Sequence, residues 1–343
     1  MNNLSFLVSE EAWEEGKFKA HPSISETMCC TKSMIERFDR KRWNFFRSLC
    51  NPYENIFSKS RLTNSKPISR AYYKIMELSK DHDLLNSSQA MSILCLAEAP
   101  GAFVQYFLDS RYKCSDNITC NTLNLPGVDI PKFHHAVTSA NSVELYSGPD
   151  NSGDICKYEI VTDLLNGKKF DLITGDGGID VSSDHNSQDK QCMKLVLCEV
   201  IIGMGCLKKN GNMTIKLFDI QDIEIVKVLA ILSKAFSSVH LTKPRSSRPA
   251  NSEKYVVCKS LECTAGLDTL VYSLRNNTPI HWHITDNFSK HIEEIRCIFA
   301  THQINSLQYI MSVIDGECVV DRKLHQRFCN EWFDKYKIND EPH

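Results

Sequence analysis

The amino-acid sequence predicts an α/β protein built on a mostly parallel β-sheet with helices on both faces. Short apolar runs bounded by Gly, Pro, Asn or Asp are typical of strands, and they recur at residues 91–97, 119–125, 170–175, 213–218, 238–241 and 255–259. Segments with helical periodicity lie between several of these runs, at residues 102–110, 191–207 and 220–236. Strands that alternate with helices favour a parallel sheet covered on both faces.

Two further patterns complete the predicted architecture. A turn-rich stretch with Pro244 and Pro249 joins the last two strands and is too short for a crossover helix, so we expect that pair to be antiparallel. The segments on either side of the core are helical in pattern. We therefore expect an amino-terminal flank (1–88), a core (89–262) and a carboxy-terminal extension (263–343), with both flanks docked on the core.

The composition indicates a soluble intracellular protein. The 343 residues carry a net charge of −2 and 15 cysteines, without any Cys-x-x-Cys pair or zinc-ligand spacing, so we expect reduced thiols and no metal. The first residues do not form a signal peptide, and the most apolar stretch, 193–207, is too short and too charged to span a membrane. Basic residues crowd two stretches, 37–47 and 243–259, and charge alone favours a solvated face for each.

A turn after the first core strand is a candidate ligand loop. The sequence LCLAEAPGAFVQYFL passes from an apolar run through Glu98 and Gly101 into an amphipathic helix. A glycine at the carboxyl end of a strand lets a ligand approach the backbone closely. One glycine is a weak signal, and the absence of the G-x-G-x-x-G pattern argues against a nicotinamide or flavin cofactor.

Four charged residues are considered together: Asp176 follows a predicted strand, Glu253 precedes one, Lys216 lies within an apolar run, and Lys74 lies in SRAYYKIMEL of the helical flank. Each alone has an ordinary explanation: Lys216 could extend outward from an edge strand, and Asp176 could be a turn residue before two glycines. Two lysines and two carboxylates together are better explained by a catalytic site.

Several segments resemble the FtsJ-like ribose 2′-O-methyltransferases and, within them, the eukaryotic cap-specific mRNA methyltransferases that form cap 1. The broader resemblance is carried by APGAF, GDGG, TIKLFD and SSRPANSEKYVVCK. The narrower one is carried by KPRSSRPANSEKYVVCK, by NPYENIF with SRAYYKIMEL, and by the terminal SLQYIMSVID and HQRFCNEWF. The resemblance covers roughly residues 30 to 335. It implies a Rossmann-like fold with a seven-stranded type of sheet, and S-adenosylmethionine as cofactor.

The resemblance also implies residue roles. Lys74, Asp176, Lys216 and Glu253 correspond to the family's Lys-Asp-Lys-Glu tetrad, with Lys216 as the group that receives the 2′-hydroxyl proton. A free lysine titrates at about 10.4, so its pKa would have to fall by roughly 3 units for it to act as a base at pH 7. Lys74 would lower that pKa, whereas Asp176 and Glu253 would raise it, and the sequence leaves open which effect is larger. A role in which Lys216 only steers the hydroxyl is also left open.

For the ligands, the resemblance assigns two sets of residues. The cofactor set is Glu98, Ala99, Pro100, Gly101, Ala102, Phe103, Asp154 and Asp176. The RNA and cap set is Arg47, Arg70, Asn186, Arg248 and Asn251. The family usually has a second glycine where this chain has Ala102, and a methyl group fits there only if φ is negative.

The implied partner is the 5′ end of capped mRNA, and the family implies a nuclear protein, or a cytoplasmic one if viral. Two alternatives remain: an FtsJ-like enzyme acting on ribosomal, transfer or small nuclear RNA, and a non-catalytic subunit that binds cofactor or RNA. The NPYE segment and the helical tail favour the mRNA cap over the other RNAs. The complete tetrad argues against a non-catalytic subunit.

Overall fold

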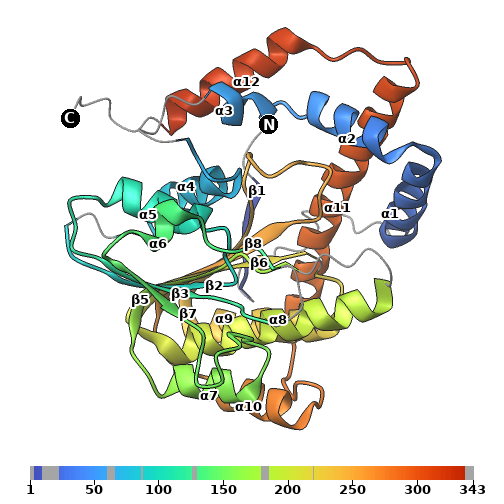
Figure 1. Ribbon diagram of the computed structural model, residues 1–343. Helices are drawn as coiled ribbons and strands as arrows, with labels where there is room; N and C mark the ends of the chain where they lie inside the picture. The colour runs from blue at the N-terminus through green and yellow to red at the C-terminus, as the bar shows by residue number, and fades with distance from the viewer. Residues whose placement is uncertain are drawn as a thin grey trace.

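One eight-stranded sheet organises the molecule. The computed structural model describes residues 4–9, 23–59, 66–85, 88–125, 130–178, 185–218 and 220–336. The strands in chain order are β1 (Leu4–Leu7), β2 (Ser92–Leu96), β3 (Asn117–Asn121), β4 (Val143–Tyr146), β5 (Phe170–Gly175), β6 (Leu207–Leu217), β7 (Phe236–Lys243) and β8 (Lys254–Leu261). Their order across the sheet is β1-β7-β8-β6-β5-β2-β3-β4 (Figure 1).

The strand directions confirm the predicted mostly parallel sheet. β4, β3, β2, β5 and β6 pair in parallel, so their carboxyl ends meet at one edge of the sheet. β8 is antiparallel to β6 and to β7, with Val239 opposite Cys258, as the short connection through Pro244 and Pro249 predicted. β1 adds an antiparallel edge strand beside β7. The chain therefore reverses direction between β7 and β8, at the same edge where the parallel strands end.

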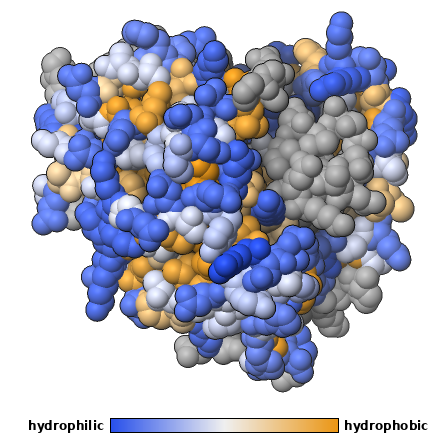
Figure 2. All heavy atoms as spheres, turned by 60° about the horizontal axis from the view of Figure 1, so that its bottom comes forward, coloured by the Kyte–Doolittle hydropathy of each residue, from blue (hydrophilic) through white to orange (hydrophobic). Residues whose placement is uncertain are grey.

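Helices cover both faces of the sheet, as predicted. The helices in chain order are α1 (Ile24–Ser33), α2 (Arg40–Leu49), α3 (Glu54–Lys59), α4 (Ala71–Asp81), α5 (Ala102–Ser110), α6 (His135–Thr138), α7 (Tyr158–Leu165), α8 (His185–Cys206), α9 (Ile223–Ala235), α10 (Leu267–Asn276), α11 (Asp286–Ile314) and α12 (Arg322–Lys335). In Figure 1, α7, α8, α9 and α10 lie below the sheet, and α4, α5 and α6 lie above it. Figure 2 shows the lower side, where hydrophilic side chains cover much of the surface and small apolar patches lie between them.

Side chains at the helix starts explain several of these boundaries. Asp39 begins α2 by accepting hydrogen bonds from the next backbone N–H groups, and Asp222 does the same for α9. Thr285 and Asp321 begin α11 and α12 in the same way. Such caps satisfy donors that a helix end leaves free, and each stabilises the protein by about 1 kcal/mol.

The flanking segments pack on the core and on each other. A buried cluster joins α1 and α2 to α11, with Trp43 and Met311 among its members. α12 packs on α4, where the indole of Trp332 is fully buried and lies edge-on to Tyr73. Residues from before and after the sheet thus build a second layer next to the edge at which the parallel strands end.

Three further properties of the described residues bear on the fold. No helix there is long and apolar enough to cross a membrane. All fifteen cysteines are free thiols, as expected. Within the same ranges, no three His, Cys, Asp or Glu side chains lie together in a way that could hold a metal ion.

Candidate active site

Four elements bring Lys74, Asp176, Lys216 and Glu253 together at the carboxyl edge of the sheet. Lys74 comes from α4, Asp176 follows β5, Lys216 lies in β6 and Glu253 precedes β8. The Nζ of Lys74 lies 2.7 Å from Oε1 and 2.8 Å from Oε2 of Glu253. The Nζ of Lys216 lies 3.2 Å from Oδ1 of Asp176 and donates to its backbone carbonyl at 2.7 Å. Each lysine therefore has one carboxylate partner.

Tyr255 joins the two ion pairs, and the sequence analysis did not single it out. Its hydroxyl donates to Oδ1 of Asp176 at 2.7 Å and lies 3.4 Å from Oε1 of Glu253. The ring is fully buried and packs against Phe103. A signal was available, because a residue two positions after Glu253 in a strand faces the same side of the sheet.

The charges of this network shift the pKa values of its members. Burial would lower the pKa of Lys216, but the carboxylates of Asp176 and Glu253 outweigh burial, and the pKa is raised. Burial would raise the pKa of Glu253, but Lys74, Lys216 and Lys243 outweigh it and lower the pKa to about 2. The sequence left open whether Lys74 or the carboxylates have the larger effect on Lys216. The carboxylates have the larger effect, and Lys216 is an ammonium ion at neutral pH.

The loop between β2 and α5 has the shape of a ligand cradle. Gly101 has φ +102°, a conformation that favours glycine, and its N–H donates to the carbonyl of Glu98 at 2.7 Å. Ala102 is the first residue of α5 and does not have a positive φ, so its methyl group fits without backbone strain. The peptide bond between Ala99 and Pro100 is cis. Glycine is therefore required at 101 and not at 102.

A second loop at the same edge carries Asp154. Gly153 has φ +62°, and a Cβ there would lie 1.8 Å from the carbonyl oxygen of Thr122, so the loop passes directly over the end of β3. The side chain of Asn121 donates to the carbonyl of Gly153 at 2.9 Å and fixes this approach. Asp154 accepts from the backbone N–H of Cys156 at 3.0 Å. Asp154 is thereby held near the ends of β3 and β4.

Two buried carboxylates between these loops have oxygens without a hydrogen-bond partner among the described residues. Glu98 accepts from Thr174 through Oε1, while its Oε2 is unpartnered. Glu199 of α8 lies beneath Gly175 and Gly177, and its Oε1 is unpartnered. Burial raises the pKa of both, to about 8 for Glu199. Burial thus favours their neutral form, and a cation bound beside them would favour ionisation and use the unpartnered oxygens.

The arginines assigned to RNA form one cluster. Arg70 and Arg248 both bind the carboxylate of Glu54, with nitrogen–oxygen distances of 2.7 and 2.8 Å. Burial, followed by the charge of Arg248, lowers the pKa of Arg47, and the Nε of Arg47 has no hydrogen-bond partner among the described residues. Glu54 belongs to the NPYE segment. Two guanidinium groups therefore share one carboxylate, and the third, that of Arg47, lies close enough for its pKa to be influenced by all three charges.

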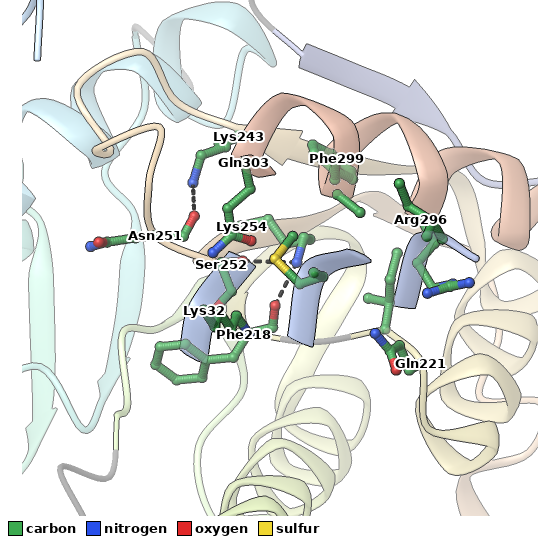
Figure 3. A pocket seen from close by; sticks show the side chains of 14 residues that line it. Lys32, Phe218, Gln221, Lys243, Asn251, Ser252, Lys254, Arg296, Phe299 and Gln303 are labelled. Carbon is green, nitrogen blue, oxygen red and sulfur yellow. Dashed lines mark hydrogen bonds between the residues drawn. The ribbon is translucent and has the colours of Figure 1, made fainter. Parts of the chain in front are cut away.

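A cavity of about 310 Å³ lies between this cluster and the four charged residues. Arg47, Asn251 and Glu253 line it, together with Lys32 of α1, which the sequence analysis missed. An adjoining smaller pocket shares Lys32 and Asn251 with it (Figure 3). Asn251 thus lines the cavity. The backbone of Asn186 lies in α8, but its side chain is outside the described residues.

The second basic stretch is not a solvated face throughout. Lys243 and Lys254 are buried, with 8% and 5% of their surface exposed. Both ammonium groups donate to backbone carbonyls around Asn251 (Figure 3). For these two lysines, charge alone predicted the wrong environment.

The sheet order and the ligand loops at its carboxyl edge define a Rossmann-like methyltransferase. A family model described as FtsJ-like methyltransferase matches residues 67–261, and the chain belongs to this family. The family uses S-adenosylmethionine. The unpartnered oxygens of Glu98 and Glu199, with Asp154 and Asp176 nearby at the same edge, fit the positive charges of that cofactor.

Three relatives carry related names. A protein of Autographa californica nuclear polyhedrosis virus, named cap-specific mRNA (nucleoside-2′-O-)-methyltransferase, is 28% identical over 207 residues, or 59% of this chain and 77% of the relative. One of Danio rerio, named with the same words and the number 2, is 28% identical over 320 residues, or 84% of this chain and 43% of the relative. One of Caenorhabditis briggsae, named inactive and 1B, is 27% identical over 283 residues, or 73% of this chain and 33% of the relative. The chain spans less than half the length of the fish and nematode relatives.

Proposed function

We propose that this chain methylates the ribose 2′-oxygen of the first transcribed nucleotide of capped mRNA. Lys74, Asp176, Lys216 and Glu253 form the catalytic tetrad in this proposal. The observation that carries it is the ion-pair network of these four side chains, which come from four elements and meet beside a cavity lined by Arg47 and Asn251. The names of the relatives support the cap as substrate.

Different tetrad residues orient the hydroxyl and accept its proton. When bound, S-adenosylmethionine supplies a methyl group on a sulfonium, which the 2′-oxygen takes in a displacement that releases the hydroxyl proton. Lys216 receives this proton, and Asp176 holds its Nζ through both the carboxylate Oδ1 and the backbone carbonyl. Glu253 and Lys74 hold the opposite side of the site as a closed ion pair. Precise alignment of this kind contributes much of the rate in displacement reactions.

The raised pKa of Lys216 has a consequence for pH dependence. Lys216 must lose its proton before it can accept one, and Asp176 and Glu253 oppose that loss. A positive charge bound nearby lowers the pKa of an ammonium group, so the free amine becomes more accessible in the loaded protein. The single-turnover rate should therefore rise with pH between 7 and 9, by up to about tenfold per unit. A flat profile over this range would instead assign Lys216 a steering role as an ammonium ion.

The substrate proposal rests on the arginine cluster and the cavity. Arg47, Arg70 and Arg248 present planar donors suited to phosphate oxygens, and the triphosphate bridge of a cap supplies several of them. The cavity next to Glu253 has room for a nucleoside beside Arg47. A cap joined to its first nucleotide matches this combination of a polyphosphate site and a nucleoside site.

One assay tests activity and substrate together. The protein is given tritiated S-adenosylmethionine and three matched RNAs that carry a 7-methylguanosine cap, an unmethylated cap or a bare triphosphate. We expect label only on the capped RNAs, in the ribose of the first transcribed nucleotide after digestion. Lys216→Ala should lower the rate at least about 1000-fold while the variant still binds S-adenosylmethionine in calorimetry.

The other outcomes distinguish the alternatives. Equal labelling of all three RNAs would reject cap recognition and favour a methyltransferase for another RNA. Label in the second nucleotide would move the acceptor position by one residue. No label on any RNA, together with normal cofactor binding, would favour the non-catalytic subunit, for which the relative named inactive is a precedent.

A further inference from the structure

Lys243, the last residue of β7, is buried, and its ammonium group donates hydrogen bonds to the loop that carries Glu253. Its Nζ donates to the carbonyl of Asn251 at 2.7 Å and to the carbonyl of Glu253 at 2.7 Å. A third contact, to Oγ of Ser247, measures 3.3 Å. A lysine ammonium has three donors, so these contacts saturate it. Figure 3 shows the side chain pointing toward Asn251.

A buried lysine without a carboxylate in direct contact is unusual. Desolvating an ammonium ion costs several kcal/mol, and a lysine at the end of a strand can ordinarily extend into solvent. Lys243 has 8% of its surface exposed. Its buried position therefore depends on the hydrogen bonds that the carbonyls of Asn251 and Glu253 accept from it.

The segment that Lys243 holds connects RNA-facing and catalytic residues. Asn251 lines the cavity, and Glu253 pairs with Lys74. The intervening carbonyl of Ser252 is bound by Lys254, whose ammonium group also binds the carbonyl of Phe218 just after β6. Three successive carbonyls are thus fixed by two buried ammonium groups.

We infer that Lys243 is a positioning residue for Glu253: by binding the carbonyls of Asn251 and Glu253, it holds the Glu253 carboxylate against Lys74 and beside the acceptor site. This inference rests on the proposed methyl transfer, and it assigns Lys243 no contact with the RNA or the cofactor. The titratable groups that face Lys243 are Glu253, Lys254, Lys74 on α4 and His302 on α11, and burial lowers the pKa of Lys243 to about 7. Glu253 is the acid in this set, so the charge of Lys243 also favours its ionised form.

The test compares Lys243→Met, which keeps the length and removes the donors, with the wild-type protein. We expect kcat to fall about 100-fold while Kd for S-adenosylmethionine stays within about threefold, because the loss is mainly one of alignment. KM for capped RNA, which depends on Asn251, should change by a smaller factor than kcat. Lys208→Met is the matched control. Lys208 lies at the amino-terminal end of β6, away from Lys216 and the active site, with 46% of its side chain exposed, and its replacement should leave kcat unchanged. An unchanged kcat in Lys243→Met would overturn the inference. A fall in kcat accompanied by a clear loss of affinity for S-adenosylmethionine and of melting temperature would also overturn it, because the effect would then be general unfolding.

A second measurement does not depend on activity. Hydrogen exchange of the peptide covering residues 246–253 should be faster in Lys243→Met than in the wild-type protein, with exchange in β2 and β5 unchanged. If wild-type protein methylates no RNA, the proposed function fails, while this exchange comparison still decides whether Lys243 fixes the loop. Where Lys243→Met does not fold, Lys243→Arg, which keeps the charge and displaces the donors, should lower kcat about tenfold with a smaller change in KM. An unchanged kcat in that variant would also overturn the inference.

Discussion

Glu77 connects three parts of the molecule, and replacing it with glutamine gives a defined loss of stability. Glu77 lies on α4, three residues after Lys74, and 1% of its surface is exposed. Its carboxylate accepts from the backbone N–H of Arg245 at 2.6 Å, the backbone N–H of Ser246 at 2.8 Å and the indole N–H of Trp332 at 3.0 Å. The loop before Glu253 and the carboxy-terminal α12 are therefore both tied to α4 through one side chain.

The expected magnitude follows from counting donors. Glutamine offers a single acceptor oxygen, so at least one of the three N–H groups loses its partner, and the new amide N–H₂ group faces donors. Hydrogen bonds to a charged group contribute roughly 1.5–3 kcal/mol each, and an orphaned buried donor costs roughly 1–3 kcal/mol. We expect Glu77→Gln to lower the free energy of unfolding by about 3–5 kcal/mol.

Urea denaturation followed by tryptophan fluorescence measures this loss, because Trp332 reports directly on the site. Glu317→Gln is the control, since Glu317 is exposed in the turn after α11 and should change stability by less than about 0.5 kcal/mol. A loss below about 1 kcal/mol in Glu77→Gln would refute the reasoning. It would mean that α12 and the loop are held mainly by apolar packing.

Three further variants test the ligand loops. Arg248→Ala should raise KM for capped RNA and reduce the slope of log KM against log salt concentration by about 0.7, because one phosphate contact on a single strand is lost; an unchanged slope would remove Arg248 from the RNA site. Gly101→Ala should destabilise the protein by about 2 kcal/mol in urea denaturation, because φ is +102° and the new methyl group meets Phe133 and Val137 at 2.9 Å, whereas Ala102→Gly should change stability by about 1 kcal/mol or less. Equal effects at the two positions would contradict the assignment of the cradle conformation to Gly101.

The sequence predicted the central part of the sheet because buried strands there are short, apolar and bounded by turn residues. β2, β3, β5, β6, β7 and β8 were all anticipated, although β6 begins at Leu207, six residues before the predicted start. Residues 208–210 of that strand are exposed and its pairing with β5 is irregular, so the apolar pattern starts late. β1 and β4 were missed, because each is a four-residue edge strand without a buried apolar run.

The predicted site residues likewise differ from the missed ones in whether the local sequence pattern reveals them. Asp176, Lys216 and Glu253 could be selected because charges at strand ends or inside apolar runs are visible in the sequence, whereas Lys74, on α4, was selected because the segment SRAYYKIMEL resembles the family. Residues whose roles depend on contacts between distant segments gave no comparable signal: Lys32, Glu77, Glu199 and Lys243. The raised pKa of Lys216 also required the distances to Asp176 and Glu253, since two opposing influences had to be weighed.

The clustering of Arg47, Arg70 and Arg248 near Glu54 has a consequence for ligand selection. Guanidinium groups repel one another, and folding overcomes this repulsion by gathering Arg70 and Arg248 around one carboxylate before any ligand arrives. With three positive side chains and one negative side chain, the cluster keeps a formal charge of +2. A monovalent anion neutralises only half of that excess, whereas a divalent or longer polyphosphate can neutralise all of it. We therefore expect the cluster to discriminate among anions by their valence.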